Sequence, residues 1–372
     1  MERCDRDGDD PSKRVEAMTS WTIGPKQVGE GAPVFIIAEL SANHLQKFDL
    51  AVETIRAIRE AGADAVKLQT YTPDTLTLDS DNDCFRIKQG TQWDGKTLYQ
   101  LYQEAYTPWE WQPELMRLAG ELGLICFSSP FDKTAVDFLE EMKVPAYKIA
   151  SFEITDIPLI AYVAAKGKPV ILSTGIATLS EIEEAVNACR SVGNDRIALL
   201  KCVSAYPAPI EESNLKTIPD LQKRFKAVAG LSDHTKGISV PIAAVALGAK
   251  IVEKHFILDR KLGGPDAAFS LEPAEFKAMA QGVREAEAAL GSVGYELTEK
   301  LQKSREFARS LFVVKEIKAG ELFTEENVRS IRPGFGLAPK YLGKVLGKKS
   351  KVHIHRGTPL NWALVEGKSD DD

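Results

Sequence analysis

The sequence lacks long apolar runs, paired cysteines and a strong bias of charge, and each absence excludes a class of protein. No apolar stretch is long enough to cross a membrane. The five cysteines are scattered, and Cys126 and Cys202 sit inside apolar stretches, which argues against a disulfide scaffold and for a reducing compartment. The net charge of −6 argues against general nucleic-acid binding. We therefore expect a cytoplasmic protein with no membrane or nucleic-acid partner.

One unit recurs from Val34 onward: a short apolar strand, a polar residue at its end, and an amphipathic helix. The expected strands are Val34–Glu39, Ala65–Gln69, Leu124–Ser128, Ala146–Ser151, Val170–Ser173, Ile197–Val203, Val228–Ser232 and Lys250–His255. The expected helices are Leu50–Ala61, Trp109–Leu122, Lys133–Met142, Pro158–Ala165, Ser180–Val192, Leu215–Phe225, Val240–Leu247 and Pro273–Leu290. Eight units in about 250 residues predict a closed (β/α)8 TIM barrel, of α/β class. An open doubly wound sheet is the alternative, but its GxGxxG loop does not follow Glu39.

The pattern changes after Gly291, where Ser310–Val314 and Lys351–Ile354 are expected as strands of a small α+β domain. This part is basic, which suggests either a solvated surface or a cationic lid over an anionic substrate. The first residues are charged and lack the apolar core of a signal peptide. We expect a disordered extension over residues 1–20, the barrel over 21–292, a linker over 293–308, the small domain over 309–367 and a tail over 368–372.

One connection, residues 71–106, is much longer than the few residues usual in a barrel loop. Six aromatic side chains lie in it: Tyr71, Phe85, Trp93, Tyr99, Tyr102 and Tyr106. Two interpretations stay open. The segment is either a subdomain with its own apolar centre or a binding loop over the barrel mouth, with aromatic faces for a sugar ring.

Polar residues end all eight expected strands, at the edge where (β/α)8 enzymes carry their active sites. They are Glu39, Lys67, Gln69, Ser128, Ser129, Lys148, Ser151, Glu153, Ser173, Ser204, Ser232, His234 and His255. A single strand-end serine is more often a helix N-cap, and a single buried lysine more often extends its head to solvent. Eight consecutive strands with polar ends favour an active site.

Two of the five histidines, His234 and His255, end neighbouring strands joined by one helix, so their imidazoles should emerge side by side. They could bind a divalent metal, or each could be a hydrogen-bonded strand-end histidine. Lys67 and Lys148, beside the serines, would hold a small dianion such as phosphate. Because a dianion alone needs no metal, the set predicts two substrates, the second with a carbonyl or hydroxyl oxygen held by the metal. Glu39 could move a proton.

At these residues the sequence resembles the sialic acid synthase family, most closely its pseudaminic acid branch. The matching segments are IIAELSANH (36–44), AVKLQTYTPDT (65–75), AYTPWEWQPEL (105–115), ICFSSPFD (125–132), YKIASFEITD (147–156), ILSTGIAT (171–178), KCVSAYPAP (201–209), GLSDHT (230–235), EKHFILDR (253–260), GGPDAAFSLEP (263–273) and RSIRPGFGL (329–337). Their occurrence together and in order, from Thr22 to Val365, makes the resemblance specific.

The resemblance implies an enzyme that condenses phosphoenolpyruvate with the aldehyde of an N-acetylated amino sugar and releases phosphate. It implies that His234 and His255 bind a divalent ion, Mn or Mg, with Glu39 as the proton-transfer group. By position, phosphoenolpyruvate is held by Lys67, Ser129, Lys148, Ser151, Ser173, Ser204 and Ser232, and the sugar by Gln69, Glu153, Tyr206, Asp266 and Arg332. Arg332 stands on a small domain similar to type III antifreeze protein (a SAF domain). In the family this domain reaches a neighbouring subunit, which implies a domain-swapped homodimer.

Some positions depart from the sialic branch. Its EIGxNHxG motif reads ELSANHLQ at residues 39–46 here, without either glycine, and Ser129 and Ser204 replace Thr and Asn. These changes argue against N-acetylmannosamine and for a 2,4-diacetamido-2,4,6-trideoxy hexose, whose apolar C6 suits an aromatic loop. N-acetylneuraminate or legionaminate synthesis stays an alternative, as do a metal-dependent aldolase and a non-catalytic carbohydrate- or ice-binding protein.

Overall fold

A computed structural model describes residues 20–88, 90 and 93–367, which form two compact units divided between Gly291 and Ser292. The extension expected over residues 1–20 lies outside the described residues apart from Ser20, and so does the tail over residues 368–372. Among the described residues, no helix is both long and apolar enough to cross a bilayer.

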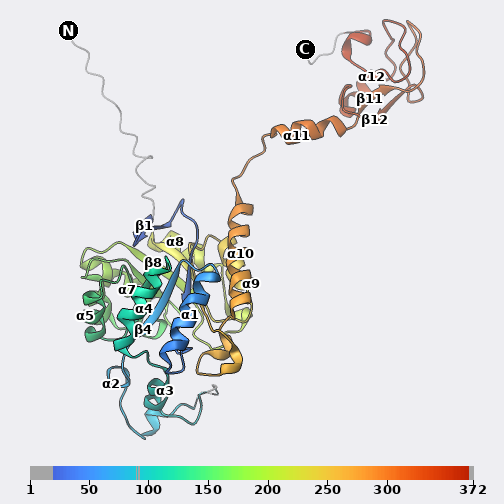
Figure 1. The fold of residues 1–372 in the computed structure, drawn as a ribbon. Coiled ribbons are helices and arrows are strands. Elements are labelled where there is room, and N and C mark those ends of the chain that lie inside the picture. Colours follow the sequence, from blue (N-terminus) through green and yellow to red (C-terminus); the bar gives the residue numbers. More distant parts are fainter. Residues whose placement is uncertain (1–19, 89, 91–92, 368–372) are drawn as a thin grey trace, which may run out of the picture. The chain divides into compact units, whose positions relative to one another are not determined.

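The first unit is a closed barrel of eight parallel strands, as predicted (Figure 1). The strands are β3 (Phe35–Glu39), β4 (Ala65–Thr70), β5 (Ile125–Pro130), β6 (Tyr147–Ile149), β7 (Val170–Ser173), β8 (Ile197–Cys202), β9 (Val228–Asp233) and β10 (Ile251–His255). They follow one another around the barrel in sequence order, and β10 pairs with β3 to close it. Nearly every strand position is buried, which accounts for their apolar composition.

Helices cover the barrel between the strands. They are α1 (Phe48–Glu60), α4 (Gln112–Glu121), α5 (Lys133–Glu141), α6 (Ile157–Ala164), α7 (Leu179–Ser191), α8 (Thr217–Phe225), α9 (Ser239–Ala246) and α10 (Pro273–Leu290). Local signals fix several starts: Asp132 caps α5, and Thr178 with Glu181 forms a capping box at α7. Short 3-10 turns join these elements at η3 (Trp109–Trp111), η4 (Ser151–Glu153), η5 (Ile210–Glu212), η6 (Arg260–Leu262) and η7 (Ala267–Phe269).

Two expected elements are at least three residues shorter than predicted. The helix expected from Trp109 begins as the 3-10 turn η3, and α4 starts only at Gln112, with a proline at its second position. The strand expected over Ala146–Ser151 ends at Ile149, because Ser151 already begins η4. Both changes lie at element ends, where local patterns are weakest.

An N-terminal hairpin was not predicted. β1 (Ser20–Ile23) pairs antiparallel with β2 (Lys26–Gly29). Ile23 and Val28 are fully buried in one cluster with Phe35 at the start of β3. The hairpin therefore closes the amino-terminal end of the barrel, opposite the end that carries α2 and α3 (Figure 1).

The long connection contains α2 (Pro73–Leu76), η2 (Asp83–Phe85) and α3 (Leu98–Ala105), and Figure 1 shows α2 and α3 beyond one end of the barrel. Its side chains reach the barrel loops. Tyr71 packs edge-on against both Tyr102 and Phe131, and Trp93 Nε1 donates to the carbonyl of Pro265 at 3.1 Å, in the loop after β10. These contacts favour the binding-loop interpretation over a self-contained subdomain.

The second unit contains α11 (Glu299–Ser304), η8 (Arg305–Phe307), β11 (Ser310–Val313), β12 (Val328–Ile331), η9 (Pro339–Tyr341), α12 (Leu342–Val345) and η10 (Trp362–Leu364). β11 pairs antiparallel with β12 over a core that includes Leu311 and Phe323. The prediction of a strand over Lys351–Ile354 was wrong. Its residues bond to different partners, Lys351 to Leu364 and Ile354 to Ile317, so no continuous ladder forms.

Candidate active site

A pocket opens at the carboxyl ends of the barrel strands. The predicted residues that line it are Glu39, Lys67, Gln69, Lys148, Ser151, Glu153, Ser173, Tyr206, Ser232, His234, His255 and Asp266. Ser129, buried on β5, and Ser204, after β8, are not among the lining residues, although Ser204 Oγ donates to Ser151 Oγ at 2.7 Å. Arg332 is exposed directly after β12 and belongs to the other unit.

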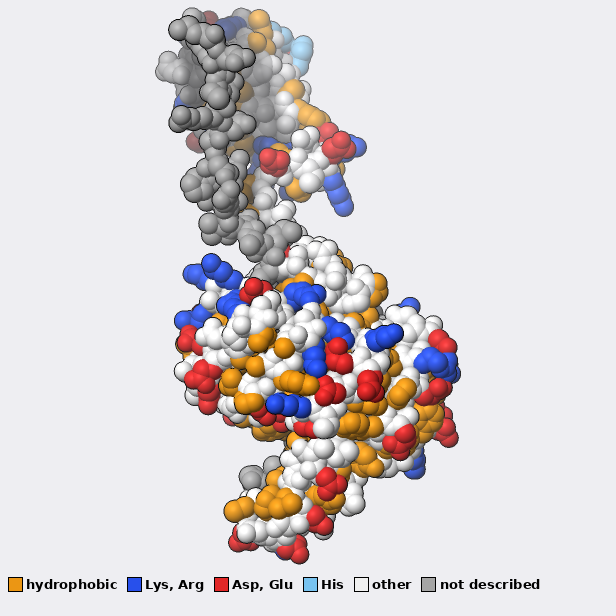
Figure 2. Space-filling view, turned by 90° about the vertical axis from the view of Figure 1, so that its left-hand side faces the viewer, with side chains coloured by type: hydrophobic (Ala, Val, Ile, Leu, Met, Phe, Trp, Pro, Cys, Tyr) orange, Lys and Arg blue, Asp and Glu red, His pale blue; other side chains and the backbone are white. Residues whose placement is uncertain are grey.

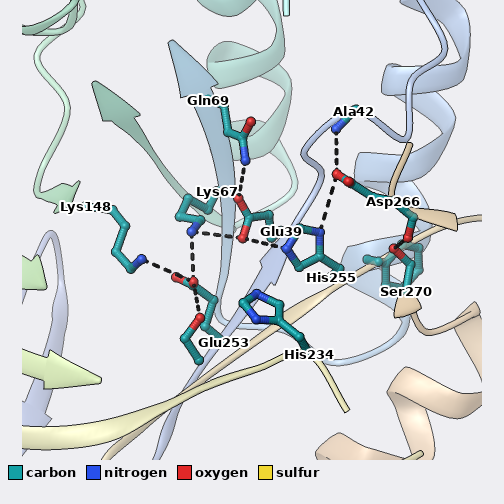
Figure 3. A network of polar contacts seen from close by, with 12 residues as sticks. Glu39, Ala42, Lys67, Gln69, Lys148, His234, Glu253, His255, Asp266 and Ser270 are labelled. Atoms are coloured by element: carbon teal, nitrogen blue, oxygen red, sulfur yellow. Dashed lines mark hydrogen bonds and ion pairs between the residues drawn. The ribbon is translucent and has the colours of Figure 1, made fainter. Parts of the chain in front are cut away.

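Strand register explains the centre of the pocket. Glu39 at the end of β3 aligns with Lys67 on β4 and with His255 on β10, so all three side chains share one rim. Glu39 Oε2 lies 2.9 Å from Lys67 Nζ and 3.3 Å from His255 Nε2, and Gln69 Nε2 donates to Glu39 Oε1 at 2.9 Å (Figure 3). Burial alone would raise the pKa of Glu39, but the charges of Lys67, His255 and Lys148 bring it below its usual range. Glu39 is therefore ionised in the unliganded pocket.

Glu253 was not predicted as a site residue, yet its carboxylate forms ion pairs with both Lys67 and Lys148. Its Oε1 lies 2.8 Å from Lys67 Nζ and 3.4 Å from Lys148 Nζ, and it accepts a 3.0 Å hydrogen bond from Ser232 (Figure 3). Burial would raise the pKa of Glu253, but Lys148 and Lys67 bring it below its usual range. Its position two residues before His255, on the same strand face, was the available signal. An arriving dianion would compete with Glu253 and Glu39 for the same ammonium groups.

The two histidines lie together as predicted, with ring centroids 5.3 Å apart. Phe269 packs against both rings, and its ring centroid lies 5.9 Å from that of His234 and 4.8 Å from that of His255. Nδ1 of His234 lies 2.9 Å from the carbonyl oxygen of Val203. Because a carbonyl only accepts, Nδ1 carries the proton and Nε2 keeps a free lone pair. Burial, then the neighbouring His255, lowers the pKa of His234 to about 3, so the ring is neutral.

This donor set fits a divalent metal ion. Neutral imidazole nitrogen and carboxylate oxygen are the ligand types such ions take, and a fixed tautomer orients the nitrogen. Carboxylates flank His255: Glu39 Oε2 is 3.3 Å from Nε2, and Asp266 Oδ2 is 3.7 Å from Nδ1. The Asp266 carboxylate also accepts from the backbone nitrogen of Ala42 at 3.3 Å, which ties the loop after β10 to the loop after β3 (Figure 3).

Buried polar atoms without a hydrogen-bond partner gather at this site. Among the described residues there are eight such side-chain atoms. Five of them lie at or just beyond the carboxyl ends of the barrel strands: Ser129 Oγ, Glu153 Oε2, Ser173 Oγ, Glu253 Oε2 and His255 Nδ1. Because buried polar groups in native proteins are nearly always hydrogen-bonded, the clustering of unpaired atoms here indicates a ligand-binding site.

An aromatic arm, formed by Tyr71, Trp93, Tyr102, Phe152 and Tyr206, lines the outer part of the same pocket. Tyr206 links it to the centre, with its ring 5.8 Å from that of Trp93 and 4.5 Å from that of His234. Phe152 lies 6.5 Å from Tyr206, and more than half of its surface is exposed. A binding loop containing Tyr71, Trp93 and Tyr102 was one of the two interpretations of the sequence, and neither included Phe152, which stands between the polar site residues Ser151 and Glu153.

Glu153 lies in the pocket with an unpaired, buried carboxyl oxygen. Burial is the main cause that raises its pKa to about 7. The folded protein therefore binds this proton more tightly than the unfolded chain, whose carboxyl has its ordinary value of 4.5. At 1.36 kcal/mol for each pH unit, the protonated group contributes about 3 kcal/mol of stability, fully present below pH 4.5 and lost as the pH rises to about 7.

Glu153→Gln should remove this loss. We expect the free energy of unfolding of the unliganded variant to fall less than that of the wild type between pH 4.5 and 7, by about 3 kcal/mol. Chemical denaturation at both pH values measures it. Glu60→Gln, at the exposed end of α1, is the control and should follow the wild type. Parallel curves for Glu153→Gln and wild type would contradict the prediction.

Comparisons with known proteins identify the family of the barrel and of the small domain. The NeuB family matches residues 54–295, and the SAF domain matches residues 308–366. Pseudaminic acid synthase of Helicobacter pylori is 51% identical over 90% of this chain and 98% of its own. Pseudaminic acid synthase of Campylobacter jejuni (strain 81-176) is 50% identical over 88% of this chain and 95% of its own.

A solved structure is also similar. N-acetylneuraminic acid synthetase of Leptospira borgpetersenii, in complex with citrate, superposes with a TM-score of 0.70 and 33% identity, over 78% of this chain and 96% of that chain. Fold, motifs and relatives thus agree: the chain belongs to the NeuB family and carries a SAF domain after its barrel.

Proposed function

We propose that this protein condenses phosphoenolpyruvate with a 2,4-diacetamido-2,4,6-trideoxy-altropyranose and water, giving pseudaminic acid and phosphate. It would thus be a phosphoenolpyruvate-dependent transferase that works in the cytoplasm. The observation that carries the proposal is one pocket that combines a lysine and serine cluster, a buried histidine pair and an aromatic arm. The half-identical pseudaminic acid synthases support this choice of sugar.

Phosphoenolpyruvate would occupy the lysine and serine side of the pocket. Its ligands would be Lys67, Ser129, Lys148, Ser151, Ser173, Ser204 and Ser232. Support comes from the unpaired hydroxyls of Ser129 and Ser173, which would donate to the anion, and from the two buried ammonium groups. The same contacts would fix the orientation of the reacting carbon C3.

His234 and His255 would hold a divalent ion, Mn or Mg, with Glu39 and Asp266 nearby. When bound, such an ion supplies Lewis-acid polarisation of a carbonyl oxygen. The protein's own contribution is to keep the His234 ring neutral and in one tautomer, through burial and the carbonyl of Val203.

The bonds change as follows. C3 of phosphoenolpyruvate forms a bond with the aldehyde carbon of the open-chain sugar, and the aldehyde oxygen takes up a proton. Water adds to C2 and loses a proton. The bond between C2 and the phosphate oxygen then breaks, the C2 hydroxyl gives its remaining proton to the departing phosphate, and C2 is left as a ketone. Glu39, a carboxylate in the unliganded site, would be the group that transfers a proton, and its support is its position beside Lys67 and His255.

The sugar would lie on the aromatic side, against Gln69, Glu153, Tyr206 and Asp266. An aromatic arm favours a sugar with a methyl group at C6 over one with a hydroxyl there, because the methyl gains from leaving water. Arg332 would complete the site from a neighbouring subunit, in a domain-swapped homodimer.

A panel of amino sugars tests the proposal. With phosphoenolpyruvate and Mn²⁺ present, we expect phosphate release to depend on a 2,4-diacetamido-2,4,6-trideoxy hexose, with a product of the mass of pseudaminic acid. A faster reaction with N-acetylmannosamine, or with the isomer that leads to legionaminic acid, would replace the sugar assignment. Cleavage without phosphoenolpyruvate would indicate an aldolase, and binding without turnover a carbohydrate-binding protein.

Arg332→Ala should raise the KM for the sugar at least about tenfold, the cost of one charged hydrogen bond of 1.5–3 kcal/mol. The KM for phosphoenolpyruvate should stay within about twofold. Steady-state kinetics with each substrate varied in turn measures both. Arg329→Ala removes an exposed arginine from β12 and is the matched control. A loss of thermal stability in Arg332→Ala alone would instead assign the residue a structural role.

A further inference from the structure

The structure assigns a second metal site, on the small domain, to Glu316, His353 and His355. Among the described residues, this is the group of three ligand-type side chains whose ligand atoms all lie within 4.8 Å of one another. His353 Nε2 is 2.9 Å from Glu316 Oε1, and His355 Nδ1 is 3.3 Å from the same oxygen. The two imidazole rings are 4.7 Å apart. We propose that the group binds a divalent transition-metal ion such as Zn²⁺.

The backbone builds this cluster. Ile317 and Ile354 form an antiparallel bridge with two hydrogen bonds, 3.0 and 2.8 Å long. Both isoleucines are buried in the core of the small domain. Because extended residues alternate between faces, the neighbours Glu316, His353 and His355 emerge on the opposite, solvent side. Figure 2 shows histidine side chains on the surface of this domain.

The donor set selects the class of ion. Two imidazoles with one carboxylate suit Zn²⁺, Ni²⁺ or Cu²⁺ better than Mg²⁺ or Ca²⁺, which prefer oxygen. Zinc ligands lie about 2.0–2.2 Å from the metal, so tetrahedral ligand atoms are about 3.4 Å apart. The distances from Glu316 to the two histidines are already close to this value. All three side chains are exposed, which leaves an open position for water or a fourth ligand.

The site would join two segments far apart in the sequence, around Glu316 and around His355. A bound ion would therefore resist separation of these segments and stabilise the folded domain. The inference does not rest on the reaction proposed for the barrel, and its test measures binding and stability without turnover.

The test is calorimetric titration of Zn²⁺ into the full-length, chelator-treated protein. We expect the wild type to bind one more equivalent of Zn²⁺ than the double variant His353→Ala/His355→Ala. The variant His234→Ala, whose substitution lies in the barrel, should still bind that additional equivalent of Zn²⁺. Glu316→Gln should weaken Zn²⁺ binding at this site at least about tenfold, because even the loss of a group that only hydrogen-bonds to a metal ligand typically weakens metal binding by that factor. Glu326→Gln, an exposed acid of the same domain that pairs with Lys315, is the matched control and should bind like the wild type.

A second measurement guards against misfolding. In the His234→Ala background, Zn²⁺ should raise the melting temperature, and adding His353→Ala/His355→Ala should abolish that shift while leaving the metal-free melting temperature unchanged. Equal stoichiometry and affinity in the wild type and the double variant would overturn the inference. So would an equal Zn²⁺-dependent shift with and without the two histidines.

Discussion

Glu253→Gln should lower the free energy of unfolding at neutral pH by about 3 kcal/mol. The substitution keeps the shape of the side chain but removes the charge that compensates two buried lysines. Lys67 keeps its 2.9 Å ion pair with Glu39, whereas Glu253 is the carboxylate within ion-pair distance of Lys148 among the described residues. A buried charge that loses its partner typically costs 3–5 kcal/mol. Chemical denaturation of the unliganded protein measures the change.

Inorganic phosphate provides a second readout of the same variant. An anion near Lys148 would restore the lost compensation, so phosphate should raise the melting temperature of Glu253→Gln more than that of the wild type. The control is Glu114→Gln, which breaks an exposed ion pair with Arg117 and should be as stable as the wild type. If Glu253→Gln is also unchanged, the lysines do not depend on this carboxylate.

His234→Ala should lower kcat by at least about 10³-fold while phosphoenolpyruvate still binds. The lysines and serines proposed to hold the anion remain, whereas the proposed metal ion would lose a neutral nitrogen ligand. Lewis-acid stabilisation of several kcal/mol corresponds to this loss of rate. Phosphate release measures turnover, calorimetry measures phosphoenolpyruvate binding, and elemental analysis measures bound manganese.

Chelator treatment of the wild type is the matching experiment. It should abolish turnover, and added Mn²⁺ should restore it in the wild type but not in His234→Ala. Full turnover of the wild type in excess chelator would show that the histidine pair acts without a metal.

Much of the barrel follows from local pattern. Apolar strands followed by amphipathic helices predicted the eight units, and the rule that parallel strands end at one edge brought His234 and His255 together. The hairpin of β1 and β2 was not predicted, because its strands are four residues long and the only apolar side chains that they bury completely are Ile23 and Val28. The strand predicted over Lys351–Ile354 does not form, because alternation of apolar and polar residues does not specify whether consecutive residues pair with the same neighbouring strand.

The loop after β3 shows a similar limit. Ser41 and Gln46 stand where the sialic branch has glycine, and both have a positive φ, of 46° and 55°. Gln46 also contacts the long connection through a hydrogen bond from its side chain to the carbonyl of Tyr106. A left-handed backbone conformation thus forms here without glycine, and one of its supporting contacts comes from a segment sixty residues away.

Residue order alone was enough for the alternation of strands and helices, the rim on which the polar side chains meet, and the pairing of the histidines, because these depend on periodicity and strand direction. Folding in three dimensions settled which charges compensate each other. Glu253 meets Lys67 and Glu39 because β10 closes against β3, and the closed barrel buries these charges, which shifts their pKa values. Such contacts join residues from opposite ends of the barrel sequence, and no local pattern specifies them.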